Sequence, residues 1–178
     1  MMSVSDIEWP WQYSFPPFFT IQPHAETKAR QLQAWRTLVL NYYKANKLSL
    51  LDIREAHQSS LFNNSTIDRK LPQEGILLVL DDLQKTGNAE PLDKSRNRWL
   101  IYWHTLEEWA ALIYNWAQAS GSLNNVCTFF ELVAGDDTSD QDFYGLDQEV
   151  LLRALQVLES QKKAEIITFD DNQGVKFF

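Results

Sequence analysis

The chain has 178 residues, of which 44% are hydrophobic and 13% aromatic, and a formal net charge of −8 at pH 7. This length and apolar content are enough for one medium-sized domain or two small ones with compact cores, which excludes extensive disorder. The acidic balance disfavours nucleic-acid binding, which needs clustered Lys and Arg, and the lack of a signal peptide or of an apolar run of ~20 residues predicts a cytosolic protein.

Residues 9–19 have the most unusual composition in the chain, with six aromatic residues and three prolines. Proline fixes φ and pushes the preceding residue toward extended geometry. We therefore predict that residues 1–24 form an extended, polyproline-like arm that is not helical, and that this arm packs on the first domain. Its rings either dock onto a partner protein or fold back over the core of that domain, and both readings stay open for different rings.

The rest of the chain contains a repeat at an offset of 75 residues, since residues 71–90 and 146–165 share eight of twenty amino acids. In both copies the apolar residues recur at helical spacing, which predicts two matching amphipathic helices. The apolar positions are Ile76, Val79, Leu80 and Leu83 in the first copy and Leu151, Ala154, Leu155 and Leu158 in the second. Pro72 suits the first turn of one helix, and Asp147 at the same repeat position suits a cap of the other.

Each copy begins with a tryptophan-bearing helix, around Trp35 and Trp109, followed by a short strand and helix at residues 51–56 and 128–132. After the repeated helix, two short runs joined by a polar turn predict a β-hairpin. These runs are Ala89–Leu92 with Trp99–Trp103, and Glu165–Phe169 with Gly174–Phe178, where Gly174 is a candidate for positive φ. This order predicts an α+β, mainly α fold of two tandem winged-helix domains, at residues 25–103 and 104–178, with the hairpins as wings.

The sequence contains no pattern that indicates catalysis, a cofactor or a metal. It has no nucleophile elbow and no glycine-rich phosphate loop, and its three histidines are dispersed. The single cysteine, Cys127, lies in an apolar context typical of a buried thiol. The acidic run 136–142 superficially resembles a calcium-binding loop, but Gln141 stands in place of the glycine and Asp147 in place of the final glutamate. We therefore predict that the protein is not an enzyme and binds neither a cofactor nor a metal.

A winged-helix fold raises the alternative of a nucleic-acid-binding or transcription-associated protein, because many such domains insert their third helix into the DNA major groove. The exposed face predicted for the first of these helices includes Asp81 and Asp82, which would repel phosphates. The first wing is locally basic at Lys94, Arg96 and Arg98, which is more typical of a solvated hairpin tip than of a contact with an anionic surface. Protein binding is the favoured class.

Segments in the arm and in both domains carry a family resemblance. They are Trp9–Tyr13, Phe15–Thr20, Leu61–Asn64, Arg69–Pro72, Leu151–Leu155, Lys163–Thr168 and Val175–Phe178. Over essentially the whole chain, the sequence resembles the animal members of the vacuolar protein sorting-associated protein 25 family, a subunit of the endosomal sorting complex ESCRT-II. The resemblance implies a non-catalytic adaptor, present in two copies, that binds the two larger winged-helix subunits of the complex.

The resemblance also implies which residues contact partners. The larger subunits are expected to bind Trp9, Trp11, Phe15, Pro16, Pro17, Phe18 and Phe19. The second domain is expected to recruit the ESCRT-III subunit charged multivesicular body protein 6 through Val126, Thr128, Phe129 and Lys163, on an exposed strand and wing edge. The process implied is the sorting of ubiquitinated cargo into multivesicular bodies. The implied location is cytoplasmic with indirect recruitment to endosomal membranes, and a nuclear pool stays open.

Overall fold

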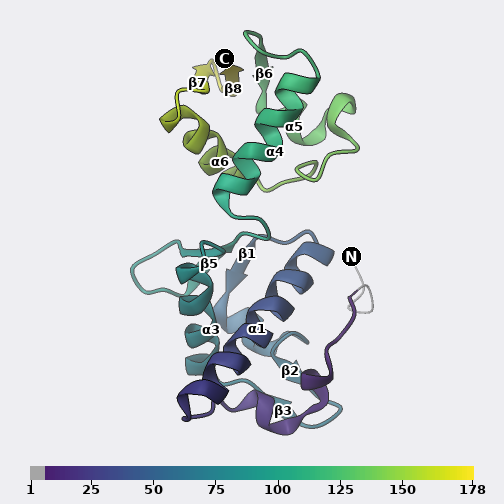
Figure 1. Ribbon diagram of the computed structural model, residues 1–178, viewed down its shortest axis with the longest axis vertical. Helices are drawn as coiled ribbons and strands as arrows, with labels where there is room; N and C mark the ends of the chain where they lie inside the picture. The colour runs from purple at the N-terminus through teal and green to yellow at the C-terminus, as the bar shows by residue number, and fades with distance from the viewer. Residues whose placement is uncertain (1–6) are drawn as a thin grey trace. The chain divides into compact units, whose positions relative to one another are not determined.

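The computed structural model describes residues 7–178, so the first six residues of the predicted arm lie outside it. The chain divides into two compact units, Met1–Trp103 and His104–Phe178, each with its own helices and sheet (Figure 1). We describe the two units separately, because each contains one copy of the repeat.

The first unit combines helices with a three-stranded antiparallel sheet. Its elements are α1 (Ala25–Ala45), β1 (Leu50–Asp52), α2 (Ile53–Gln58), β2 (Asn63–Asn64), β3 (Arg69–Lys70), α3 (Gln73–Lys85), β4 (Ala89–Pro91) and β5 (Arg98–Ile101). The sheet has the strand order β1-β5-β4, so the β4–β5 hairpin forms the wing and β1 pairs with its second strand. The small β2–β3 hairpin is not predicted, because two-residue strands are too short to give an alternating pattern.

The second unit repeats this order. Its elements are α4 (Leu106–Ala119), β6 (Val126–Thr128), α5 (Phe129–Ala134), α6 (Gln148–Ser160), β7 (Ala164–Phe169) and β8 (Asn172–Phe177). Its sheet has the order β6-β8-β7, and residues 170–171 form the tip of the β7–β8 wing. Where the first unit has β2–β3, a 3-10 turn, η4 (Asp136–Thr138), lies in the acidic loop. The predicted fold of two tandem winged-helix domains is confirmed.

The repeated helices α3 and α6 are amphipathic, as predicted. All the apolar positions of the pattern are buried, namely Ile76, Val79, Leu80, Leu83, Leu151, Ala154, Leu155 and Leu158. Both helices begin at the same repeat position, although Pro72 has extended backbone geometry and is the N-cap of α3 rather than part of its first turn. Asp147 caps α6 by accepting hydrogen bonds from the N–H groups of Glu149 and Val150.

Gly174 has a different role from the one predicted. It lies inside β8 and does not adopt positive φ, which in this wing is found at Asp170 with φ 50°. A Cβ atom at position 174 would lie 3.0 Å from the carbonyl oxygen of Cys127 and 3.0 Å from the Phe169 ring. The position therefore favours glycine because backbone and ring approach it closely, not because the turn requires it.

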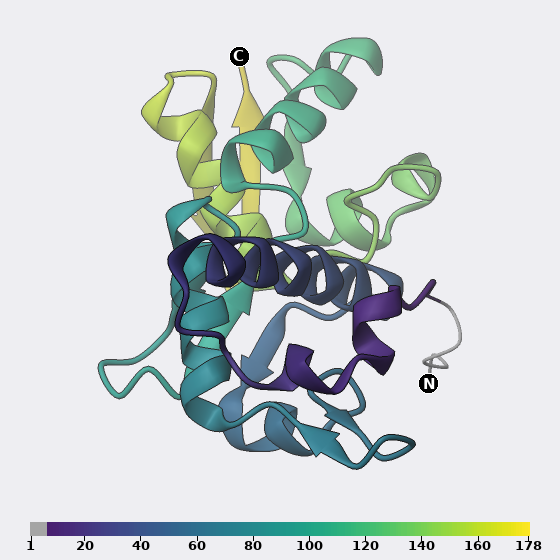
Figure 2. The same ribbon diagram turned by 60° about the horizontal axis from the view of Figure 1, so that its bottom comes forward.

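Residues 11–19 of the arm do not form one extended segment. Trp11–Ser14 and Pro16–Phe19 form two 3-10 turns, η2 and η3, which lie alongside α1 (Figure 2). The expectation of a polyproline-like arm that is not helical is wrong for these residues. A short 3-10 turn accepts proline at its first positions, where the missing N–H costs no hydrogen bond, and Pro16 and Pro17 occupy those positions in η3.

Candidate protein-docking site

The two phenylalanines at the end of the arm belong to the core of the first unit. Phe18 stacks on Trp35 of α1 with ring centroids 4.1 Å apart, and Phe19 meets the same indole edge-on at 5.5 Å. Both phenylalanine side chains are buried, with 4% and 1% of their surface exposed. Stacked and edge-to-face pairs are favourable aromatic geometries. Of the two readings of the arm, folding back over the core therefore applies to these two rings.

The backbone of η3 is fixed by the buried side chain of Gln31 in α1. Its amide nitrogen donates to the carbonyl oxygens of Phe18 and Thr20, both at 2.9 Å, and its amide oxygen accepts from the N–H of Gln22 at 2.9 Å. The indole N–H of Trp35 adds a bond to the Phe18 carbonyl at 3.0 Å. Because a buried amide is costly to leave unpaired, these bonds specify where the end of the arm lies on α1.

Tyr13 in η2 is the second point of attachment. Its hydroxyl donates to the carbonyl oxygen of Ser60, and the side-chain amide of Asn64 donates to the Tyr13 carbonyl at 2.7 Å. Burial raises the pKa of the Tyr13 phenol, which further favours the neutral hydroxyl that donates this hydrogen bond. The Trp9 ring lies against it with centroids 4.1 Å apart. The arm is thus held at both of its turns.

Three of the seven predicted contact residues of the attached arm face solvent: Trp11, Phe15 and Pro17, called the arm patch below. Trp11 is 70% exposed and Phe15 47% exposed, and their ring centroids are 5.6 Å apart. Trp9 and Pro16, which are also predicted contacts, are half-buried. The seven predicted arm residues therefore separate into two buried anchors, Phe18 and Phe19, two half-buried residues and the exposed arm patch.

A groove of about 300 Å³ runs beside the arm patch, between the arm and α1. The arm patch forms one wall, and Thr27, Arg30 and Ala34 of α1 form the other. Large rings exposed next to a groove are typical of a surface that a protein partner covers, because burying them removes much apolar area from water. The arrangement can bind a partner through the two rings without unfolding the arm.

The second predicted site is only partly accessible. Val126 and Lys163 are exposed, whereas Thr128 is half-buried and its hydroxyl accepts a hydrogen bond from the N–H of Glu131, which caps α5. Phe129 is 5% exposed, so its assignment to an exposed strand edge is wrong: it is the first residue of α5 and points into the core. In the sheet order β6-β8-β7, Val126 and the start of β7 next to Lys163 lie at opposite edges. The four residues do not form one compact patch.

Phe130, which the sequence does not single out, is 70% exposed. It borders a groove of about 530 Å³ that lies between α5, the start of α6 and the tip of the second wing, where Asp170 and Asp171 are exposed. A helix of six residues has too few turns to reveal its exposed face by periodicity, so the sequence gives no signal that separates Phe130 from Phe129.

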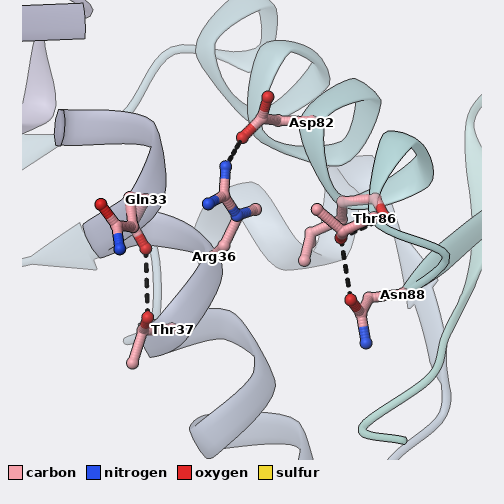
Figure 3. A network of polar contacts seen from close by, with 7 residues as sticks. Gln33, Arg36, Thr37, Asp82, Thr86 and Asn88 are labelled. Atoms are coloured by element: carbon pink, nitrogen blue, oxygen red, sulfur yellow. Dashed lines mark hydrogen bonds and ion pairs between the residues drawn. The ribbon is translucent and has the colours of Figure 1, made fainter. Parts of the chain in front are cut away.

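The acidic residues at the end of α3 are paired within the first unit. Arg36 of α1 and Asp82 point toward each other and form an ion pair (Figure 3). Arg96 of the first wing pairs with Asp81 and lies over the Trp99 ring at 5.1 Å. The central basic residue of the wing is therefore held against its own domain, which supports the reading of this wing as a solvated hairpin tip.

The second unit holds the single thiol of the chain. Cys127 is buried, and burial raises the pKa of its thiol, with a further contribution from Glu131, so it is a poor nucleophile. Within residues 7–178, no group of three or more His, Cys, Asp or Glu side chains is placed to hold a metal ion. Over the same residues, no helix has the length and apolar character that a membrane crossing requires.

Comparisons with known proteins identify relatives over nearly the full length. A family model described as ESCRT-II complex subunit matches residues 12–147. The chain is 54% identical over 171 residues to vacuolar protein-sorting-associated protein 25 of Homo sapiens, covering 96% of this chain and 97% of the relative. The Drosophila melanogaster protein of the same name is 45% identical over 175 residues, covering 98% and 100%.

Solved structures give the same result. The crystal structure of subunit VPS25 of the endosomal trafficking complex ESCRT-II aligns with a TM-score of 0.82 and 30% identity, covering 94% of this chain and 97% of that one. A chain from the crystal structure of the ESCRT-II complex VPS22/VPS25/VPS36 aligns with a TM-score of 0.81 and 29% identity, covering 94% and 98%.

Proposed function

This chain belongs to the ESCRT-II complex subunit family, and we propose that it acts there as a non-catalytic adaptor between protein partners. The observation that carries the proposal is the arm patch, in which two large aromatic rings stay exposed on an arm whose other rings are buried in the core or packed half-buried against it. A fold that needed the arm only as a cover would gain by burying these rings as well. A partner that covers them explains why they are exposed.

The partners proposed for the arm patch are the two larger winged-helix subunits of ESCRT-II, with two copies of this chain in each complex. A solved relative comes from a complex that also contains subunits named VPS22 and VPS36, whose counterparts are the candidates. In this assembly the chain would work in the cytoplasm, and it would reach endosomal membranes indirectly, through the larger subunits. The comparisons do not support a nuclear pool.

Co-expression with these two larger subunits tests the adaptor proposal. We expect the wild-type chain to co-purify with both, and light scattering to give the mass of a complex with two copies of the chain. Titration with duplex DNA over a range of salt concentrations tests the alternative function in parallel, since a nucleic-acid-binding protein would show steeply salt-dependent affinity. Failure to join the larger subunits, combined with such DNA binding, would replace the adaptor proposal with the alternative.

For the second unit we propose recruitment of the ESCRT-III subunit charged multivesicular body protein 6, in the sorting of ubiquitinated cargo into multivesicular bodies. Val126 is the best candidate contact of the predicted set, because it is exposed and lies on the edge strand β6. Lys163 is exposed but lies 5.1 Å from the Tyr114 ring, so its charge already has a partner. The exposed Asp170 and Asp171 would suit a basic partner helix in the groove beside Phe130, which is the alternative contact surface of this unit.

Calorimetric titration with purified charged multivesicular body protein 6 tests this second proposal. Val126→Asp should weaken binding by about tenfold or more, because it places a charge in an apolar contact. Phe130→Asp is the matched variant on a different exposed apolar side chain of this unit and should bind like the wild type. If Phe130→Asp weakens binding and Val126→Asp does not, the partner uses the groove beside α5, and the assignment to the strand edge is wrong.

A further inference from the structure

Strand β7 is an outer strand of the second sheet and is six residues long. The N–H of Phe178 donates to the carbonyl oxygen of Lys163 at 2.9 Å. This bond shows that the backbone of Lys163 faces β8. Successive residues of a strand direct their backbone groups to opposite sides, so the N–H and C=O groups of Ala164, Ile166 and Thr168 point away from β8. An edge of this kind is a template on which another strand can pair.

The central donor of this edge is blocked by a side chain. Glu159, at the end of α6, accepts a hydrogen bond at Oε2 from the N–H of Ile166 at 2.9 Å. A strand added to β7 would need the same N–H for one of its own carbonyl oxygens. The Glu159 carboxylate occupies that place and would repel an incoming carbonyl oxygen, since both carry negative charge.

In the first wing, the residue at the position equivalent to Ile166 has no backbone N–H donor. At the offset of 75 residues, Ile166 corresponds to Pro91, which lies in β4, an edge strand of the β1-β5-β4 sheet. The N–H of Leu92 donates to the carbonyl oxygen of Arg98 at 2.8 Å, so position 91 directs its backbone outward. Proline has no N–H and is found at sheet edges for this reason. Both wings therefore lack a free donor at the equivalent position of their outer edge.

The charges at the ends of β7 indicate which strand would pair with it if the edge were open. Lys162 precedes β7, and Asp170 and Asp171 follow it; all are exposed. If β7 paired antiparallel with β7 of a second copy, centred on Ile166, the turn that carries Lys162 would lie beside the turn that carries Asp170 of the second copy. Opposite charges brought together at both ends of the pair would stabilise it, so the flanking charges of this edge fit a second copy of the same strand.

We propose that the Glu159 carboxylate, by occupying the Ile166 N–H, prevents β7 from pairing with β7 of a second copy of the chain. In the free subunit this hydrogen bond makes the central N–H of β7 unavailable to another strand. A change that removes the carboxylate from the Ile166 N–H would open that edge to self-association.

Two variants at position 159 test whether the carboxylate prevents strand pairing. Glu159→Ala removes the acceptor, whereas Glu159→Gln keeps an acceptor oxygen and serves as the matched control. Both changes are at an exposed helix end, and circular dichroism with thermal unfolding will confirm that the variants are folded. In sedimentation equilibrium over a range of concentrations, we expect the association constant of Glu159→Ala to exceed that of the wild type by about tenfold or more. Glu159→Gln should remain close to the wild type.

Second changes in the Glu159→Ala background test the strand and its register. Ile166→Pro copies the residue of the first wing and should return association to the wild-type level. Lys162→Glu places like charges near Asp170 of the second copy and should have the same effect, and it decides the question if the proline variant does not fold. The proposal is overturned if folded Glu159→Ala associates no more than the wild type, or if adding Lys162→Glu leaves its association unchanged.

Discussion

Trp11→Ala combined with Phe15→Ala is expected to abolish co-purification with the two larger ESCRT-II subunits while the chain remains folded. Because Trp11 is 70% and Phe15 47% exposed, their truncation removes little buried area. The free energy of unfolding should fall by less than about 1 kcal/mol. At an interface, truncating an aromatic anchor costs about 2 kcal/mol or more, so the pair should weaken assembly by about a hundredfold or more.

The second unit offers a matched control for this variant. Phe130 is also 70% exposed, but it lies on α5 rather than on the arm. Phe130→Ala should co-purify with the larger subunits like the wild type, so that a loss specific to the arm variant cannot be attributed to the removal of surface apolar area. Assembly of the arm variant with wild-type affinity would contradict the assignment of the arm patch as the anchor.

The repeat architecture is predictable because its signals are local and occur twice. The periodic apolar positions of α3 and α6 specify a buried face, and every one of them is buried. The copies support each other, since the segment after each helix gives a hairpin at the same offset. The spacing of apolar residues along a helix does not depend on which elements pack against that helix. It can therefore be recognised from the sequence alone.

The arm is less predictable because tertiary contacts decide its conformation. Proline content favours an extended segment, but the stack of Phe18 on Trp35 and the bonds from Gln31 fold η3 onto α1. None of these contacts has a periodic pattern in the sequence. The same limit applies to α5, where Phe129 and Phe130 are adjacent and only packing decides that the second is exposed. Composition therefore identifies the aromatic segment of the site, but not which of its rings face solvent.

Phe18→Ala is expected to destabilise the first unit rather than to act through an interface. The change removes a buried ring stacked 4.1 Å from Trp35 and leaves a cavity in the core. Large-to-small changes of this kind lower the free energy of unfolding by about 3–5 kcal/mol. Urea unfolding followed by tryptophan fluorescence measures the loss. Phe15→Ala, a truncation of the same residue type three positions earlier on the exposed side of the arm, should cost less than about 1 kcal/mol.

This pair of variants also separates two ways in which the arm could bind a partner. Phe18 cannot fill the core beside Trp35 and a pocket of the partner at the same time, so an arm that stays attached binds through the exposed rings alone. If the arm stays attached, Phe18→Ala should lower the free energy of unfolding of the chain. Any loss of assembly should then equal the fraction of the variant that is unfolded. If Phe18→Ala instead unfolds at the urea midpoint of the wild type and still fails to assemble, the arm must leave the core when it binds, and Phe18 itself contacts the partner.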